Sequence, residues 1–255
     1  RALITGGSLG LGLAIAETFA KAGASVAVVA RRTDVLEDAR KKLLEAGAPK
    51  AVAISADVGK AHDCDRVYKE AVAGMGGVDV LVNNAGTSQR GPFESISDEL
   101  WQHDLDLKLF AAVRLARLVL PDMKEKRFGR IINVLNTGAK APPAEGAPTA
   151  VSRAAGMALT KVLAGEGAKY NVLVNGLLVG RIESDQWVRR HAADAAQGSN
   201  KSLEDYYANM GKSLPIGRLG TAQEFANAAL FLASDAGSYI TGTAINVDGG
   251  LCPVV

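Results

Sequence analysis

Glycines with a particular spacing are the first feature of this chain that could do chemistry, in the run Thr5-Gly6-Gly7-Ser8-Leu9-Gly10-Leu11-Gly12. Glycines let a backbone approach a pyrophosphate closely, and a helix N-terminus adds free N–H groups and the positive end of its dipole. A strand-like run, Ala2–Thr5, precedes this loop, and a helical stretch begins at about Leu11. The strand, loop and helix together predict a dinucleotide-binding site, for which glycine spacing alone is a weak signal.

Two arginines indicate which dinucleotide would bind. The second strand-like run, Ser25–Ala30, is followed by Arg31 and Arg32, with no acidic residue at that position. An acidic side chain there binds the ribose 2′-hydroxyl of NAD, whereas an arginine accommodates the 2′-phosphate of NADP. Arg31 is the better candidate because a guanidinium forks onto phosphate and stacks on adenine. We therefore expect NADP(H) rather than NAD(H); the alternative is that both arginines are solvated loop charges.

The elements that must position these residues follow a simple alternation of strands and helices. The strand-like runs are Ala2–Thr5, Ser25–Ala30, Ala51–Ser55, Val78–Asn83, Arg130–Leu135, Val172–Leu177 and Ala244–Val247. The helical stretches are about Leu11–Ala22, Thr33–Ala46, Ala61–Gly74, Asp98–Glu125, Thr149–Ala168 and Ala222–Leu232. Continuous Val, Ile, Leu and Ala runs are typical of strands buried on both faces. The pattern predicts one Rossmann-type, doubly wound α/β domain over residues 1–255, with a parallel seven-stranded sheet and helices on both faces.

One segment, at about residues 183–215, breaks this alternation. It is polar and rich in small residues apart from the aromatic residues Trp187, Tyr206 and Tyr207. Long irregular segments inside compact domains are usually functional. We expect short helices that form a lid over the substrate; the alternative is a surface excursion without a role.

Composition excludes several other classes of function. The 255 residues carry a net charge of +2, which gives no electrostatic case for a nucleic-acid partner. No uncharged apolar run reaches the length of a transmembrane helix, so we expect no membrane partner. Cys64 and Cys252 lie far apart and in no metal-binding spacing. We therefore expect no metal and a cytoplasmic protein with reduced thiols.

Further short motifs show a resemblance to the short-chain dehydrogenase/reductase family along nearly the whole chain. They are the TGxxxGxG form of the loop, Asp57-Val58, Asn83-Asn84-Ala85-Gly86, Val174-Asn175 with Gly180, Ile182 and Ser184, Ile240-Thr241-Gly242, and Val247-Asp248-Gly249-Gly250. Val179 and Ser184 replace a Pro and a Thr that are usual in the family. Together these motifs are highly specific, and they imply the family's oxidoreductase fold and cofactor site.

The resemblance implies roles for the matching residues in cofactor binding. With the two arginines above, the expected cofactor-binding set is Gly6, Ser8, Leu9, Gly10, Gly12, Arg31, Arg32, Asp57, Val58, Asn84, Ala85, Gly86, Arg153, Gly180, Ile182 and Ser184. The glycine loop would surround the phosphates. Asp57 would accept a hydrogen bond from the adenine amino group, and Val58 would pack on the ring. Ile182 and Ser184 would hold the nicotinamide carboxamide.

The same resemblance places four unusual residues in the active site. The family's Ser, Tyr and Lys positions hold Asn136, Thr149 and Arg153, and its helix Asn position holds Lys108. In the family, the Tyr exchanges the substrate proton and the Lys lowers its pKa. A threonine hydroxyl is far less acidic than a phenol, and too short to reach the same point. Arg153 can bind ribose hydroxyls but is a poor proton relay, whereas Asn136 can still donate to a substrate oxygen.

Lys108 is the one replacement of a kind that could take over proton transfer. If it lies near Arg153, burial and like-charge repulsion both lower its pKa toward the useful range. It could then act as a proton donor or as an amine nucleophile. It could also pair with Arg153 around an anionic substrate, or be a solvated or structural lysine.

Three functions follow from this frame. We expect an NADP(H)-dependent oxidoreductase that acts on a small carbonyl or alcohol substrate through an atypical active site. The alternatives are a catalytically silent NADP(H)-binding subunit or sensor, and a non-redox lyase or isomerase that uses Lys108. The resemblance also implies a homotetramer, formed through the long helices from Asp98 and Thr149 and the C-terminal strand, and a dimer is compatible with it.

Overall fold

Parallel strands make up the centre of the computed structural model, which describes residues 1–196 and 202–255. They are β1 (Ala2–Thr5), β2 (Val26–Ala30), β3 (Ala51–Ser55), β4 (Val80–Asn83), β5 (Gly129–Asn136), β6 (Val172–Val179) and β7 (Ala244–Val247). They form one 7-stranded sheet in the order β3-β2-β1-β4-β5-β6-β7, which confirms the predicted doubly wound architecture. The chain proceeds outward in opposite directions from the β1–β4 pair, so the ligand crevice is expected at the carboxyl ends of these strands.

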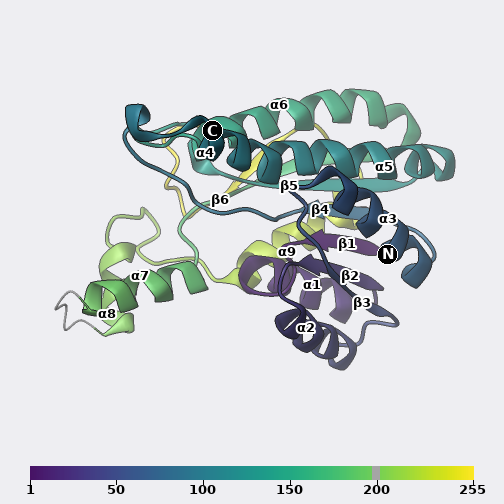
Figure 1. Ribbon diagram of the computed structural model, residues 1–255, viewed down its shortest axis with the longest axis horizontal. Helices are drawn as coiled ribbons and strands as arrows, with labels where there is room; N and C mark the ends of the chain where they lie inside the picture. Colours follow the sequence, from purple (N-terminus) through teal and green to yellow (C-terminus); the bar gives the residue numbers. More distant parts are fainter. Residues whose placement is uncertain (197–201) are drawn as a thin grey trace.

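Helices cover both faces of the sheet (Figure 1). One face carries α1 (Gly10–Lys21), α2 (Thr33–Glu45) and α9 (Ala222–Ala233). The other face carries α3 (Ala61–Met75), α4 (Asp98–Leu105), α5 (Ala111–Lys126) and α6 (Thr149–Gly167). Each layer of helices therefore encloses its own apolar core against the sheet.

The apolar strands divide their side chains between these two cores. In β5, Ile131 belongs to the same core as Val67 and Leu115 on the α3 and α5 side, while Ile132 belongs to the core with Ile15 and Phe225 on the α1 and α9 side. Successive side chains of a strand point to opposite faces. A strand buried on both faces therefore needs a continuous apolar run, which is why these strands read as such runs in the sequence.

The long helix expected over Asp98–Glu125 is not a regular α-helix. Ser97 begins it by accepting a 3.3 Å hydrogen bond from the Leu100 backbone N–H. A π-helical turn at Asp106–Phe110 then separates α4 from α5, and Lys108 lies buried within this turn. A π-turn holds an additional residue and shifts the faces of the helix that follows; such turns are frequent at functional sites.

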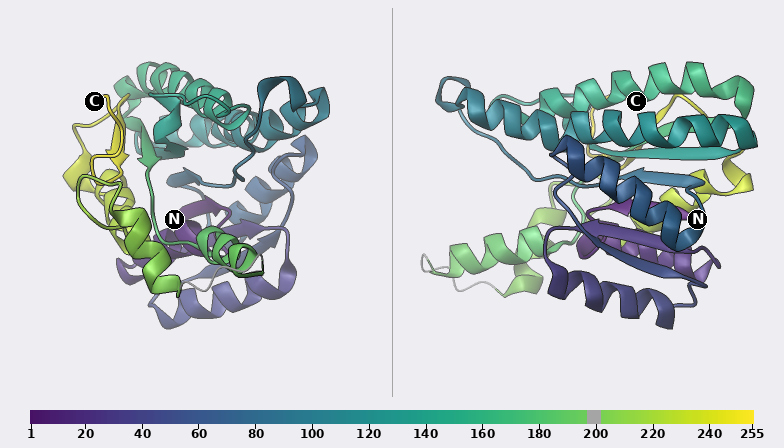
Figure 2. Two further views of the ribbon diagram at one scale, coloured as in Figure 1. Left: turned by 90° about the vertical axis from the view of Figure 1, so that its left-hand side faces the viewer. Right: turned by 45° about the vertical axis from the view of Figure 1, so that its right-hand side comes forward.

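The segment expected as a lid does form short helices, α7 (Asp185–Ala196) and α8 (Leu203–Gly211). Figure 2 shows that they project away from the body of the sheet. The rings of His191 and Tyr206 meet edge-on at 5.4 Å and join the two helices. The rest of the expected lid, residues 197–201, lies outside the described residues. No described helix combines the length and the apolar character needed to cross a membrane.

Candidate active site

A cavity of about 240 Å³ opens at the carboxyl ends of the strands around the β1–β4 pair. Its lining residues are Gly6, Ser8, Val29, Ala30, Arg31, Arg32, Ala56, Asp57, Val58, Ala85, Gly86, Thr87 and Leu107. These residues come from the ends of β1, β2, β3 and β4 and from the helical segment after α4. Residues that the sequence singled out at four separate strand ends thus share one cavity, at the switch point of the sheet.

Hydrogen bonds from the segment after β4 hold the glycine loop in shape. Asn84 Nδ2 donates to the carbonyl oxygens of Thr5 and Gly6 at 3.0 and 3.1 Å. The backbone N–H groups of Asn84 and Ala85 both donate to Thr5 Oγ1 at 3.0 Å. Gly6 has a φ of +63°, in the region that favours glycine. A Cβ on Gly12 would overlap the Gly6 carbonyl oxygen and Asn84 Nδ2, so helix α1 can start here only because Gly12 lacks a side chain.

The other expected cofactor residues do not line this cavity. Leu9 caps α1 and is exposed, and Gly10 follows it with a φ of +55°. Gly180, Ile182 and Ser184 come after β6. Gly180 packs closely against Asp248, and Ile182 is buried.

Positive charge stands at the rim of the cavity. Arg31 and Arg32 both line it and both have exposed side chains. The segment that carries them is attached to β3, because Ser55 Oγ donates to the Arg31 carbonyl oxygen at 3.2 Å. A fixed backbone with two exposed guanidinium groups is an arrangement that suits an anionic ligand.

An ion pair that the sequence reasoning missed lies beside this cavity. Lys108 Nζ contacts Asp104 Oδ1, and both side chains are fully enclosed, with 0% of either exposed. Ser152 Oγ donates to the second oxygen of Asp104 at 2.7 Å. Neither Asp104 nor Ser152 was expected at the site. The signal available in the sequence was an acidic residue four positions before a lysine on one helix.

Burial lowers the pKa of Lys108 to about 8, with the positive charge of Arg153 as a further cause. The hydrogen bond and the negative charge of Asp104 act in the opposite direction and raise the pKa. Burial and Arg153 are the two causes expected from the sequence, and both operate. A lysine in this range exchanges a proton near neutral pH, which an ordinary lysine cannot do efficiently.

Arg153 connects the ion pair to the cavity. Its Nη1 donates to the Val134 carbonyl oxygen at 2.6 Å. Burial lowers its pKa to about 10, so the guanidinium remains charged at pH 7. A Cβ on Gly86 would overlap Arg153 Nη2 and would lie 3.7 Å from Lys108 Cγ. Gly86, which lines the cavity, therefore has both cationic side chains packed against it.

Thr149 connects Lys108 to the segment after β4. Lys108 Nζ donates to Thr149 Oγ1 at 2.8 Å. The same hydroxyl donates to the Gln89 carbonyl oxygen at 2.7 Å and accepts from the Gln89 N–H at 2.9 Å. The amine of Lys108 thus meets a carboxylate and a hydroxyl rather than open space. This enclosure disfavours its expected alternative role as an amine nucleophile.

Asn136 stands at the end of β5 with an unused hydrogen-bonding group. Its Oδ1 atom is buried, and no donor among the described residues reaches it. A Cβ on Gly138 would lie 3.3 Å from this oxygen and 3.7 Å from the Ala150 side chain, so Asn136 faces the start of α6. Buried polar atoms normally have partners. Among the described residues, Asn136 therefore offers a hydrogen-bond acceptor without a donor at the end of β5.

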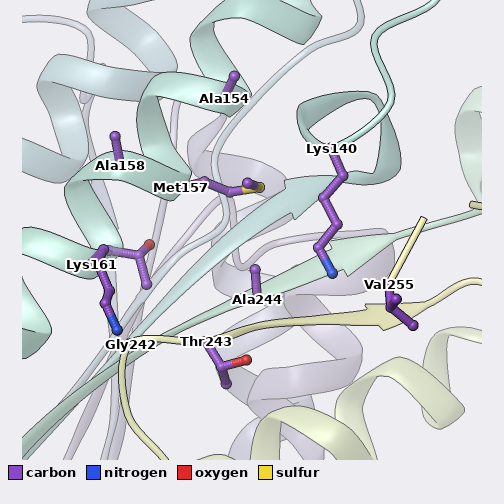
Figure 3. Close-up of a pocket in the computed structure, with 10 residues that line it drawn as sticks. Lys140, Ala154, Met157, Ala158, Lys161, Gly242, Thr243, Ala244 and Val255 are labelled. Carbon is purple, nitrogen blue, oxygen red and sulfur yellow. The ribbon is translucent and has the colours of Figure 1, made fainter.

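A second cavity, of about 610 Å³, lies between α6 and β7 (Figure 3). Lys140 and Lys161 stand at opposite ends of it, and Met157 and Ala244 contribute apolar surface. Its described lining includes none of the residues expected in the cofactor or catalytic site. This cavity is separate from the site at Gly86.

Comparison with known proteins defines the class. The family profile described as enoyl-(acyl carrier protein) reductase matches residues 6–252. The match covers almost the entire chain, including the glycine loop from Gly6 onward and every strand of the sheet after β1. The chain belongs to the short-chain dehydrogenase/reductase family of oxidoreductases.

Three relatives illustrate the range of the family around this chain. The 3-oxoacyl-(acyl-carrier-protein) reductase FabG of Escherichia coli (strain K12) is 34% identical over 250 residues, which cover 98% of this chain and 96% of FabG. L-sorbose reductase from Gluconobacter frateurii, solved with NADPH and L-sorbose, is 36% identical with a TM-score of 0.95 and coverage of 100% and 97%. An NADPH-bound short chain oxidoreductase from Pseudomonas aeruginosa PAO1, described as containing an atypical catalytic center, is 36% identical with a TM-score of 0.90 and the same coverage.

Proposed function

We propose that the protein is an NADP(H)-dependent oxidoreductase that reduces a small carbonyl substrate and uses Lys108 as its proton source. The observation that carries the proposal is the meeting of two sites at Gly86. This glycine lines the cavity between the strand ends, and Arg153 and Lys108 pack against it. A carbonyl group held there would have both a cofactor and a titratable amine nearby. Relatives solved with NADPH, one of them with L-sorbose, support the same class of reaction.

The residues of the cavity fit a dinucleotide. Gly6, Ser8 and the N-terminus of α1 offer backbone N–H groups to a pyrophosphate, and Leu9, Gly10 and Gly12 form the cap and first turn of that helix. Asp57 and Val58 line the end where adenine would lie, and Arg31 and Arg32 the position of a 2′-phosphate. Asn84, Ala85 and Gly86 would support ribose together with Arg153. Gly180, Ile182 and Ser184 would approach the nicotinamide. NADPH, when bound, supplies the hydride that is added to the carbonyl carbon.

Lys108 would provide the proton that balances this hydride. The Lys108 ammonium donates to Thr149 Oγ1, and the resemblance to the family implies that Thr149 takes the position of its Tyr. As the carbonyl oxygen gains negative charge, the Thr149 hydroxyl would turn from the Gln89 carbonyl oxygen to the substrate oxygen, pass its proton to it and take one from Lys108. The products would be an alcohol and a neutral lysine, which has to regain a proton before the next turnover. Because threonine is shorter than tyrosine, the substrate oxygen has to approach the start of α6 closely.

Asn136 would complete the binding of the substrate. Its amide can donate to the carbonyl oxygen and thereby stabilise developing negative charge. Its unpartnered Oδ1 can accept from a hydroxyl group on the substrate. Asp104 neutralises Lys108, and Arg153 would be occupied with the ribose of the cofactor, so Lys108 itself gives no electrostatic reason to expect an anionic substrate. We therefore propose a small neutral hydroxycarbonyl compound.

The direct test is NADPH oxidation by the purified protein, followed by absorbance. The substrate panel would contain neutral hydroxyketones and aldehydes, with 3-oxoacyl thioesters and 2-oxo acids for comparison. We expect turnover of the neutral hydroxycarbonyl compounds with NADPH in preference to NADH. Binding of NADPH without oxidation across the whole panel would reject the proposal.

A second candidate, a silent NADP(H)-binding subunit, is favoured by one observation. The Thr149 hydroxyl is fully engaged by Lys108 and Gln89, and the Lys108 side chain has no exposed surface. In that case the same network would only stabilise the segment after β4. Tight NADPH binding, measured by fluorescence, without turnover would select this candidate. The non-redox lyase or isomerase has less support because it needs Lys108 to be accessible.

Replacing Arg31 by aspartate is expected to reverse the preference for NADPH over NADH. The Arg31→Asp variant should raise KM for NADPH by about tenfold or more, because a charge-assisted contact with the 2′-phosphate is lost and repulsion replaces it. KM for NADH should fall, because an acidic side chain at this position binds the ribose 2′-hydroxyl. Steady-state kinetics with both cofactors measure the change, with Lys60→Ala on the neighbouring surface as the control. An unchanged preference would show that Arg31 is a solvated loop charge.

A further inference from the structure

Asp104 carries a negative charge at a fully buried position of helix α4. Its side chain has no exposed surface, and it is one of the few charged groups of the described chain enclosed in this way. Both carboxylate oxygens have partners: Oδ1 contacts Lys108 Nζ, and Oδ2 accepts from Ser152 Oγ at 2.7 Å. An enclosed carboxylate is costly unless it is paired and hydrogen-bonded. Asp104 meets both conditions. Lys108 pairs with it, and Ser152 on α6 donates a hydrogen bond to it.

The surroundings of Lys108 are defined by two helices. Asp104 faces it from α4, on the preceding helical turn. From α6 it meets the Thr149 hydroxyl at 2.8 Å, and the charge of Arg153 acts on it from the same helix. Ser152, also on α6, holds the far side of Asp104. Lys108 therefore lies between one negative and one positive charge, and among the described residues Thr149 is the neutral hydrogen-bond partner of its amine.

We propose that Asp104 is a positioning residue that keeps Lys108 protonated and directs its amine at Thr149. Without this carboxylate, enclosure and the nearby guanidinium would both favour the neutral amine, which can no longer give up a proton. The Ser152 hydroxyl fixes the carboxylate, so the direction of the Lys108 amine is set from both helices. The inference rests on the proposed function, since it concerns the proton that this reaction would consume.

The reduction rate should depend on pH in a defined direction. Burial and Arg153 lower the pKa of Lys108, and Asp104 raises it. A protonated Lys108 is present below its pKa, so the reduction rate should fall as pH rises through about 8 in the natural protein. Removing the negative charge of Asp104 lowers the pKa further. The alkaline limb of the rate profile then moves to lower pH.

The test uses the Asp104→Asn variant of the full chain and pH profiles of kcat for the hydroxycarbonyl substrate. We expect the alkaline limb to move by about one pH unit or more toward acid, equivalent to a tenfold loss at a pH on that limb. Activity should recover as the pH is lowered. Asp106→Asn is the matched control, because Asp106 pairs with Arg114 at 2.8 Å and not with Lys108. Its limb should coincide with that of the natural protein.

A purely structural Asp104 would give a different result. Its replacement would lower the rate equally at all pH values, or only lower the unfolding temperature, and an unmoved limb would overturn the inference. Ser152→Ala provides a milder variant should Asp104→Asn fold poorly. This variant keeps the negative charge of Asp104 but removes the hydrogen bond that fixes its carboxylate. It should move the alkaline limb of the kcat profile toward acid by a smaller amount.

A second measurement separates this inference from the proposed function. In protein labelled with ¹³C at lysine Cε, the Lys108 resonance, assigned by its loss in Lys108→Met, reports the pKa of the amine without any turnover. If the natural protein never oxidises NADPH but Asp104→Asn lowers this pKa, the proposed function fails and the role of Asp104 in holding the charge stands. If turnover occurs and neither the resonance nor the pH limb responds, the inference fails and the function stands.

Discussion

Replacing Lys108 by methionine and Asp104 by asparagine together is expected to lower kcat by about 10²–10³-fold, the usual contribution of a positioned general acid. NADPH affinity should stay near that of the natural protein, because neither residue lines the cavity between the strand ends. Steady-state NADPH oxidation gives kcat, and fluorescence titration gives the affinity. A selective loss of kcat would identify Lys108 as part of the chemistry rather than of cofactor binding.

The paired replacement is needed because Lys108→Met alone leaves the enclosed Asp104 carboxylate without its cation. Breaking a buried pair in this way costs about 3–5 kcal/mol of unfolding free energy and would confuse instability with lost catalysis. Lys140→Met is the control, because Lys140 lines the separate cavity between α6 and β7. Retention of most of the natural kcat by the double variant would refute the role of Lys108 as proton source. Water or another group would then have to supply the proton.

Gly12→Ala is expected to damage both stability and cofactor binding. The added Cβ overlaps the Gly6 carbonyl oxygen and Asn84 Nδ2, and a backbone atom cannot rotate away as a flexible side chain can. We expect a loss of about 1–3 kcal/mol in unfolding free energy, as for other overpacked sites. NADPH affinity should fall by about tenfold or more, because the glycine loop would have to shift at the point where it approaches a pyrophosphate most closely. Denaturant unfolding and fluorescence titration measure the two effects.

Gly165→Ala is the matched control for that substitution. Gly165 also lies inside a helix, α6, but a Cβ there would meet nothing within 4 Å. An alanine in an open helical position should raise the unfolding free energy by about 0.5–1 kcal/mol. NADPH affinity should not change. If both variants behaved alike, the close approach of Gly12 to Gly6 would not be what restricts this position.

The sheet and its loops could be predicted because they depend on local patterns. Strands β1, β3 and β7 have the bounds expected from the sequence, and β6 continues two residues further, to Val179. The larger difference concerns the helix expected over Asp98–Glu125. The π-turn at Asp106–Phe110 could not be recognised from the apolar periodicity of the sequence, because it depends on tertiary packing. Lys108 lies in that turn, so its surroundings could not be derived from helical spacing alone.

In the candidate site, too, some features could be predicted from local patterns, whereas others depend on tertiary packing. Gly6, Arg31, Asp57 and Ala85 could be assembled in advance, since parallel strands bring their carboxyl ends to one edge. Lys108, Thr149 and Arg153 were expected near one another through the family resemblance. Asp104 was not, although it lies only four residues before Lys108. An acid and a lysine at this spacing usually form an exposed pair of small effect, and only the packing of α4 against α6 encloses it.

By itself, the sequence determined the class of fold, the place of the glycine loop and the types of residue that we expect in the active-site frame. It could do so because strand runs, glycine spacing and motif residues are local properties of the chain. Only the tertiary structure decided the electrostatics of that frame. The pKa of Lys108 depends on how deeply α4 and α6 bury it and on the opposed charges of Asp104 and Arg153. Burial and distance between helices are properties of packing, and no single stretch of sequence contains them.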